Sequence, residues 1–266
     1  MLETLTVRRG GGVATVVMHR GGNNAIASDL ATELESAFGE LGSDPEVRAV
    51  VVASQYEKYF SVGADLTTMA AIDRDAPEAE DQIVAMVESL VAGFNAIEAC
   101  PKPVIAAIGG HALGGGCELT LACDYRIMVD DGRSLIGQTE TALGIIPGAG
   151  GTQRLPRLIG KARALPLLLE GRRLLAPEAE AIGLVHQAVA ADEFQAAVNG
   201  LAGRLAKAAT LALGLTKDAV HRGFDLPFKE AMAVEARNFA RASLSQDAVV
   251  GIVSFLSKQA PEFTGR

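Results

Sequence analysis

The chain has 266 residues, of which 49% are hydrophobic and 21% charged, and its formal net charge is −8. This length suits one large domain, or one domain with an appendage, and the apolar content is ordinary for a soluble globular protein. The acidic balance argues against a nucleic-acid-binding protein, because such a protein presents a basic patch.

Targeting, membrane and disulfide features are not indicated by the sequence. The N-terminal residues lack a basic segment followed by an apolar one, so no signal peptide is expected. No apolar run approaches the roughly 18–20 residues that cross a bilayer. Cys100, Cys117 and Cys123 lack the spacing of a disulfide framework or a metal site, and we expect them to be small buried residues. A cytoplasmic protein without membrane or nucleic-acid partners is therefore expected.

Hydrophobic periodicity predicts alternating strands and helices up to about residue 190. A β-hairpin is expected around the glycines of residues 5–20, followed by an amphipathic helix over 28–44 with Ser28 or Asp29 as its cap. The next predicted elements are a buried strand at 48–54, a helix at 79–99, a strand at 102–110, a short helix at 117–122 and a strand at 124–129. This order favours an α/β layered fold.

From residue 191 the pattern becomes purely helical. The four amphipathic segments lie at 191–209, 211–223, 228–244 and 246–259. We therefore divide the chain into a core over 1–190 and a helical region over 191–266. The apolar faces of these helices must be buried on the core or on a partner subunit.

Two glycine loops and two carboxylates are the strongest chemical signal. The loop "FSVGADL" (60–66) follows one predicted strand, and "LGGGCEL" (113–119) follows the next. Loops at the ends of neighbouring strands can aim backbone N–H groups into one crevice and form an oxyanion hole. Glu118 lies in the second loop and Glu140 in a later glycine-rich loop. Either glutamate alone is typical of a solvated or capping residue, so the combination carries the hypothesis.

Common nucleotide and nucleophile motifs do not account for these glycines. Neither "GGHALGGG" nor "GIIPGAGGTQRL" fits a dinucleotide-binding pattern or a P-loop, and no nucleophile elbow of the form GxSxG is present. The four histidines, His19, His111, His186 and His221, are scattered without ligand spacing. A nicotinamide-binding domain is therefore not expected.

Several long segments resemble the crotonase superfamily, the enoyl-CoA hydratase/isomerase group. They are "FSVGADL", "KPVIAAIGGHALGGGCELTLACD", "IGQTETALGIIPGAGGTQRLPRLIGKARA", "AIGLVHQAV" and "FLSKQAPEFTGR". The resemblance covers nearly the whole chain. It implies a spiral of ββα units followed by a helical C-terminal region that assembles into a homotrimer or a dimer of trimers.

The resemblance also implies roles for individual residues. Ala64 and Gly115 correspond to the two backbone donors that hold a thioester oxygen, and Glu118 and Glu140 to the carboxylate pair of hydratases. Gly148 corresponds to a position that lines the water site. The remaining substrate-binding positions are Ala25, Asp65 and Leu66, together with Phe255 and Lys258, which are expected to reach the CoA site of a neighbouring subunit.

The expected function is reversible addition of water to a trans-2-enoyl-CoA, giving a 3-hydroxyacyl-CoA. No metal or redox cofactor is expected, because CoA is part of the substrate. Since the protein is acidic, local basic residues must meet the CoA phosphates, and the candidates are Arg20, Lys58, Lys102 and Lys258. The alternatives are a double-bond isomerase on the same scaffold and a non-catalytic acyl-CoA-binding homologue. The acid and base roles of the two glutamates stay open.

Overall fold

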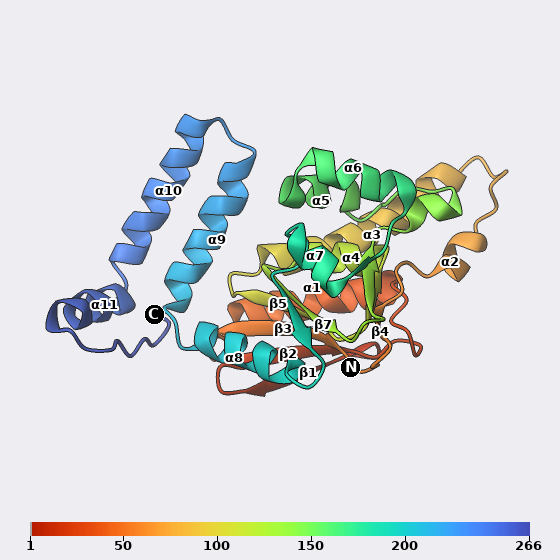
Figure 1. The fold of residues 1–266 in the computed structure, drawn as a ribbon. Helices are drawn as coiled ribbons and strands as arrows, with labels where there is room; N and C mark the ends of the chain where they lie inside the picture. Colours follow the sequence, from red (N-terminus) through yellow and green to blue (C-terminus); the bar gives the residue numbers. More distant parts are fainter. Residues whose placement is uncertain (1) are drawn as a thin grey trace.

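The computed structural model describes residues 2–266, and a six-stranded sheet forms the centre of the molecule (Figure 1). The strand order is β1-β2-β3-β5-β7-β10, in which β1 and β2 form the predicted antiparallel hairpin and the other neighbours are parallel. The strands are β1 (Leu5–Gly10), β2 (Val13–Met18), β3 (Ala49–Ser54), β5 (Val104–Ile108), β7 (Tyr125–Asp130) and β10 (Gln187–Ala190). All five residues of β5 are buried, as the continuous apolar run predicts for a central parallel strand.

A second, smaller sheet was not visible in the hydrophobic pattern. Its strand order is β4-β6-β8-β9, and the strands are β4 (Tyr59–Ser61), β6 (His111–Leu113), β8 (Leu135–Gly137) and β9 (Leu174–Leu175). Short strands follow β3, β5 and β7 directly, and a helix follows each pair, which confirms the predicted spiral of ββα units. The segments read as loops at 60–66 and 113–119 are therefore partly strand and partly helix.

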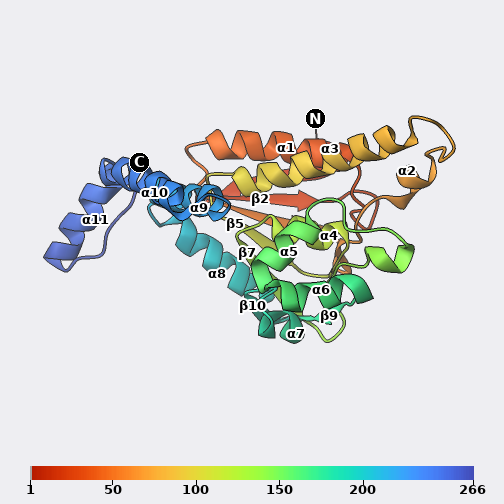
Figure 2. The ribbon, with the colours of Figure 1, turned by 90° about the horizontal axis from the view of Figure 1, so that it is seen from above.

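Two long helices cover one face of the large sheet. Figure 2 shows α1 (Ser28–Ser43) and α3 (Ala79–Ala99) side by side above the strands. The predicted apolar stripe of α1 is buried. The expected cap is wrong: α1 begins after Ala27, whose side chain cannot cap, and Asp29 pairs with Arg20 instead.

Helix α3 also departs from the expectation that no segment could span a bilayer. It has 21 residues, and its most apolar stretch has a mean hydropathy of 1.2, which is sufficient by length and composition alone. One such helix is weak evidence, because a helix of a folded core passes the same test. Here α3 packs along α1, and its partly exposed Ile83 and Val84 line the cavity described below.

The predicted C-terminal helices are all present. Helix α8 (Phe194–Ala206) packs Val198 and Ala202 against the other face of the sheet. Helices α9 (Thr210–Phe224), α10 (Phe228–Ser243) and α11 (Gln246–Ser257) extend away from it (Figures 1 and 2). We call α9–α11 the helical tail. The first predicted helix of residues 191–266 thus lies on the core, and a functional boundary at residue 190 stays a prediction.

The remaining helices surround the end of the spiral where the small sheet lies. They are α2 (Leu66–Ala70), α4 (Gly115–Leu121), the 3₁₀ helix η1 (Glu140–Leu143), α5 (Gly151–Ile159), α6 (Lys161–Glu170) and α7 (Ala176–Ala181). Helix α4 begins two residues earlier than predicted. The three cysteines are buried free thiols, as expected, and burial raises the pKa of Cys123 to about 12.

Candidate active site

The two glycine segments meet because β4 and β6 are neighbours in the small sheet. Ser61 pairs with Ala112 in parallel strands, so the segments that follow these two residues leave the small sheet at the same edge. The backbones then approach so closely that a Cβ on Gly116 would lie 2.5 Å from the Ser61 carbonyl oxygen. Gly114, at φ +52°, adopts a backbone conformation that favours glycine just before α4 begins. Close packing and backbone direction therefore explain the consecutive glycines.

The N–H groups of Ala64 and Gly115 lie next to each other at this junction. A Cβ on Gly115 would be 3.3 Å from the Ala64 nitrogen. Within residues 2–266 neither N–H has a protein acceptor. The residues on either side of Ala64 bond to Ile26: the Ile26 N–H donates to the Gly63 carbonyl, and the Ile26 carbonyl accepts from the Asp65 N–H. Both residues line one cavity of about 680 Å³. Two adjacent donors of this kind can stabilise a developing oxyanion.

The two predicted glutamates face the same cavity. Glu118 lies in the first turn of α4 and is 3% exposed, and its Oε1 accepts from the N–H groups of Ala149 (2.8 Å) and Gly151 (2.7 Å). Glu140 begins η1 and is 9% exposed. With its amide oriented to satisfy both groups, the buried Gln138 donates to the two carboxyl oxygens of Glu140 at 3.0 and 3.2 Å. The structure therefore places both carboxyl groups in the lining of one cavity.

Burial and neighbouring charged or polar groups shift the pKa values of the two carboxyl groups. Burial raises the pKa of Glu118, but two N–H donors and the nearby Arg154 act in the opposite direction. For Glu140, burial and the charge of Glu118 raise the pKa to about 7. Glu140 is therefore partly protonated near neutral pH, and the two groups titrate as a coupled pair. Such a site can act as base and acid at once.

Apart from Glu88 and Thr139, the side chains in the rest of the cavity lining are apolar. Helices α2 and α3 and the segment from η1 to Gly148 supply its walls. The apolar side chains are Val62, Leu66, Met69, Ile83, Val84, Met86, Val87, Leu90, Leu143, Ile145 and Ile146. A Cβ on Gly148 would lie 3.3 Å from the side chain of Val87, so the loop after η1 passes close to α3. The cavity can hold an apolar chain with its polar end beside the carboxyl pair.

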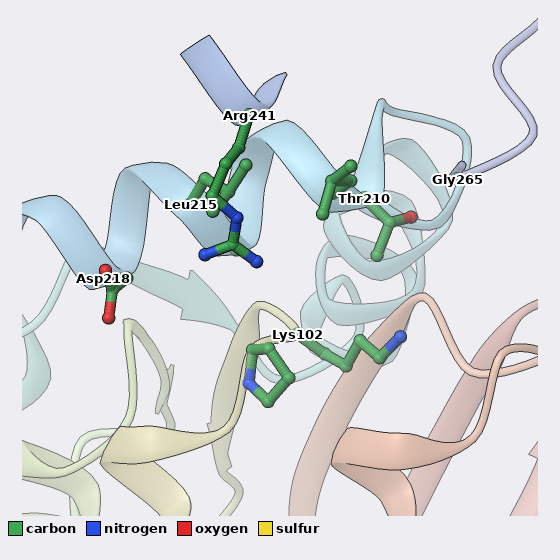
Figure 3. A pocket seen from close by; sticks show the side chains of 9 residues that line it. Lys102, Thr210, Leu215, Asp218, Arg241 and Gly265 are labelled. Carbon is green, nitrogen blue, oxygen red and sulfur yellow. The ribbon is translucent and has the colours of Figure 1, made fainter. Parts of the chain in front are cut away.

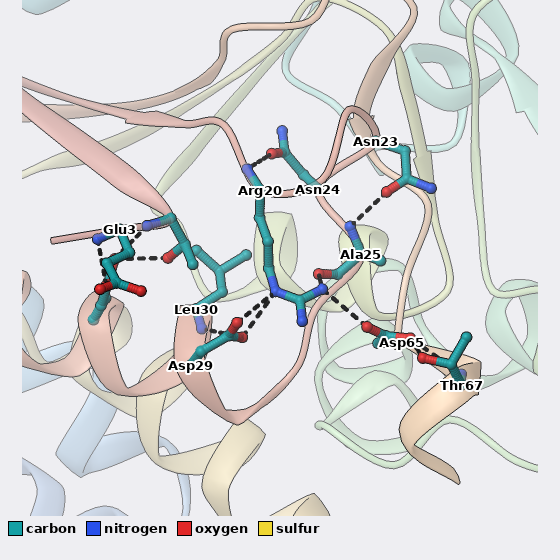
Figure 4. Close-up of polar contacts among 11 residues, drawn as sticks. Glu3, Arg20, Asn23, Asn24, Ala25, Asp29, Leu30, Asp65 and Thr67 are labelled. Atoms are coloured by element: carbon teal, nitrogen blue, oxygen red, sulfur yellow. Dashed lines mark hydrogen bonds and ion pairs between the residues drawn. The ribbon is translucent and has the colours of Figure 1, made fainter. Parts of the chain in front are cut away.

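Two other predicted binding residues lie beside the cavity rather than in its lining. Figure 4 shows that Arg20 joins them: it donates to the Ala25 carbonyl (2.9 Å) and to Asp65 (3.0 Å). Arg20 also pairs with Asp29 at 2.8 Å. Its charge is balanced by two carboxylates, so Arg20 is a structural cross-link and a poor candidate for binding CoA phosphates. Leu66, next to Asp65, does line the cavity.

The remaining predicted residues lie elsewhere in the single chain. Phe255 and Lys258 are exposed at the end of α11, on the opposite side of the molecule from α2 and α4 (Figures 1 and 2). Lys102 lines a separate cleft of about 340 Å³ against the helical tail (Figure 3). Lys58 lies over the ring of Tyr59, 5.0 Å from its centroid. One copy of the chain thus brings the carboxyl pair and the N–H pair together, but brings none of these four residues to them.

Sequence reasoning did not single out Gln138 or Arg154. Both lie within quoted motifs, "IGQTE" and "GGTQRL", but their roles depend on which groups the fold places beside them. Gln138 contacts Glu140, and Arg154 contacts the loop that binds Glu118. The only signal available was their position inside the segments that carry the resemblance.

A ββα spiral whose paired N–H groups and two buried carboxyl groups line one cavity is the arrangement expected of an acid–base site on a crotonase fold. The chain belongs to the enoyl-CoA hydratase/isomerase family, whose family model matches residues 8–266. It is 37% identical over 265 residues to a probable enoyl-CoA hydratase of Mycobacterium tuberculosis, with 99% of each chain covered. It is 38% identical over 243 residues to a crotonyl-CoA hydratase of Syntrophomonas wolfei, covering 91% of this chain and 90% of the relative.

Solved structures agree with this assignment. The crystal structure of an enoyl-CoA hydratase from Geobacillus kaustophilus matches with a TM-score of 0.92 and 33% identity, covering 99% of this chain and 97% of that one. An enoyl-CoA hydratase from Bacillus anthracis matches with a TM-score of 0.91 and 33% identity, covering 99% and 100%. The predicted fold class is confirmed by these similarities.

Proposed function

We propose that this protein is an enoyl-CoA hydratase, which adds water reversibly to a trans-2-enoyl-CoA and forms a 3-hydroxyacyl-CoA. The observation that carries the proposal is the presence of Glu118 and Glu140 in one cavity with the N–H groups of Ala64 and Gly115. The names of the relatives support the same activity. The reaction is hydro-lyase chemistry and needs no added cofactor, because CoA belongs to the substrate.

The N–H pair accounts for stabilisation of the intermediate charge. When water attacks C3 of the conjugated thioester, electron density moves to the thioester oxygen. The N–H groups of Ala64 and Gly115 lie side by side and donate to that oxygen in the proposed complex. Removing one donor of this type from other enzymes lowers the rate by about 10²–10³.

The different surroundings of the glutamates suggest their roles. Glu118 has one oxygen held by two N–H groups, which favours the carboxylate, so it is the base that takes a proton from the attacking water. Glu140, whose pKa is raised to about 7, is the acid that gives a proton to C2. The water oxygen bonds to C3, Glu118 then releases the proton it gained to solvent, and Glu140 takes up a proton from solvent before the next turnover. Atoms and charge therefore balance over one turnover.

Substrate binding divides between this cavity and a neighbouring subunit. The apolar walls receive the acyl chain, and the edge formed by Ala25, Asp65 and Leu66 is the side from which the thioester enters. Phe255 and Lys258 would contact CoA from another copy of the chain in a homotrimer or a dimer of trimers. This assembly is part of the proposal.

The decisive experiment is incubation of the purified protein with crotonyl-CoA. Loss of the conjugated enoyl absorbance, with formation of 3-hydroxybutyryl-CoA, supports the hydratase. A parallel reaction with a trans-3-enoyl-CoA tests the isomerase, which moves a proton between C2 and C4 without water. Binding of both thioesters without turnover would overturn the proposed enzymatic activity and would indicate a non-catalytic acyl-CoA-binding protein.

A further inference from the structure

The loop that binds Glu118 is itself held from its other side. The N–H groups of Ala149 and Gly151 donate to Glu118 Oε1, while the carbonyl of the same Ala149 accepts from Arg154 Nη1 at 3.1 Å. A single peptide segment thus lies between the carboxylate and a guanidinium group. Movement of that segment would move the two donors that orient Glu118.

The guanidinium of Arg154 is fixed by contacts to another helix. Its Nε and Nη2 donate to Glu98 Oε2 at 3.0 and 2.5 Å, and Nη2 also donates to Asn95 Oδ1 at 2.7 Å. The side chain is 14% exposed. Gly150 has φ +112°, and a Cβ there would overlap Arg154 Nη1. The loop therefore leaves room for the guanidinium, which ties α5 and the loop to α3.

Helix stability alone does not explain this ion pair. Arg154 lies near the N-terminus of α5, and Glu98 lies in the last turn of α3. A cation near a helix N-terminus and an anion near a C-terminus are each disfavoured by the helix dipole, by about 0.3–1 kcal/mol. Each charge therefore lies at the unfavourable end of its own helix. What the arrangement does provide is a fixed donor to the Ala149 carbonyl.

We propose that Arg154, anchored by Glu98, is a positioning residue for the base of the reaction. It sets the Ala149–Gly151 segment, and through it the direction of the Glu118 carboxylate towards the attacking water. This inference rests on the proposed hydratase function. Misplacement of a reacting group by about 1 Å can lower a rate by about 10². Arg154 itself does not touch the substrate.

The kinetic test compares Arg154→Gln with a variant of a similarly buried ion pair that makes no contact with the Ala149–Gly151 segment. Lys217 is 13% exposed and pairs with Asp124 at 2.8 Å, so Lys217→Gln is the matched control. We expect Arg154→Gln to lower kcat for crotonyl-CoA by about 30- to 100-fold with KM within threefold. Lys217→Gln should lower Tm by a similar amount and leave kcat within threefold.

Glu98 variants separate positioning from the loss of a charge. Glu98→Gln keeps an acceptor for Arg154 and should give a smaller loss of kcat, which also keeps the test usable if Arg154→Gln does not fold. The double variant Arg154→Gln/Glu98→Gln leaves neither charge unpaired and should be as slow as Arg154→Gln alone. A kcat for Arg154→Gln no lower than that of Lys217→Gln, or recovery of kcat in the double variant, would overturn the proposal.

A measurement without turnover distinguishes this inference from the function on which it rests. Hydrogen–deuterium exchange, followed by mass spectrometry of a peptide covering residues 147–154, reports on the amides of Ala149 and Gly151. We expect faster exchange of this peptide in Arg154→Gln than in Lys217→Gln. If the wild-type protein fails to hydrate crotonyl-CoA, the hydratase proposal fails. Unchanged exchange in Arg154→Gln would then overturn the role of Arg154 independently.

Discussion

The candidate active site is buried within one chain, whereas the helical tail leaves most of its large apolar side chains exposed. In α4 every residue is buried, including the carboxyl group of Glu118. In α10 and α11 the buried residues are the polar Asn238 and Asp247. Large apolar side chains of the tail face outwards instead: Val220, Phe224, Phe228, Phe239, Leu244, Val249, Ile252, Val253, Phe255 and Leu256.

One part of the molecule is complete in a single chain, and the other is not. A buried carboxyl group lowers stability, so two of them in one cavity indicate a function that requires them. Exposed apolar surface of this extent is uncommon on monomers and indicates a missing neighbour. We propose that the tail is an assembly element, and that its neighbours bring Phe255 and Lys258 to the CoA site.

The largest effect is expected from the carboxyl pair. Glu118→Gln and Glu140→Gln should each lower kcat for hydration by about 10²–10⁴, because each removes a proton-transfer group. The double variant should be scarcely slower than either single one, since the two groups act as a unit. Calorimetric binding of a saturated acyl-CoA should be largely retained. Near-normal hydration by Glu118→Gln, with loss of isomerisation, would favour the isomerase.

The backbone of α4 should be nearly as sensitive. Gly115→Pro removes one N–H donor, while proline is tolerated at the first position of a helix. We expect activity to fall by about 10²–10³ or more, with a folded protein by circular dichroism. A folded variant with wild-type kcat would show that the Gly115 N–H is not required for catalysis.

Titration of Glu140 should link stability and activity to pH. Its pKa is raised from the ordinary 4.5 to about 7 in the folded protein, so the folded state binds this proton more tightly than the unfolded state. The resulting stabilisation is present below about pH 4.5 and is lost as pH rises to about 7. Relative to Glu140→Gln, the wild-type free energy of unfolding should fall by about 3 kcal/mol from pH 4 to pH 8.

Urea unfolding of both proteins at several pH values measures this difference. Hydration by the wild-type protein should also decline above about pH 7, as Glu140 loses the proton that it donates. A difference in unfolding free energy that does not vary with pH would show that Glu140 has an ordinary pKa.

Removal of residues 245–266 tests the tail. This deletion removes α11 with Phe255 and Lys258, so we expect a smaller particle by light scattering. KM for crotonyl-CoA should rise about tenfold, equivalent to roughly 1.4 kcal/mol of binding free energy. A folded truncated protein with unchanged particle mass and unchanged KM would contradict the assembly role.

The smallest effect for a single change concerns the apolar walls of the cavity. If they hold the acyl chain, kcat/KM should rise about fourfold for each added methylene, the equivalent of about 0.8 kcal/mol, from crotonyl-CoA to trans-2-octenoyl-CoA. Ile83→Ser should reduce this increase, because Ile83 lines the cavity. Its kcat/KM for crotonyl-CoA serves as the control and should change little. A series without chain-length dependence would place the acyl chain elsewhere.

Much of the scaffold followed from local pattern alone. The hairpin of β1 and β2 and the amphipathic α1 were predictable because their apolar residues follow the strand or helix period, and the buried strands β3 and β5 because they are short continuous apolar runs. The strands of the small sheet have two or three residues, too few for a periodic signal. The cap of α1 was mispredicted because the Asp29 carboxylate pairs with Arg20, and a capping rule based on neighbouring residues does not include that contact.

The sequence by itself also determined which residues could carry the chemistry, since Ala64, Gly115, Glu118 and Glu140 lie in recognisable motifs. Only the tertiary structure decided what these residues do together. Pairing of β4 with β6 set two distant N–H groups side by side, and burial raised the pKa of Glu140 to about 7. Both effects depend on distances between segments far apart in the chain and on exclusion of water, which exist only once the core has packed.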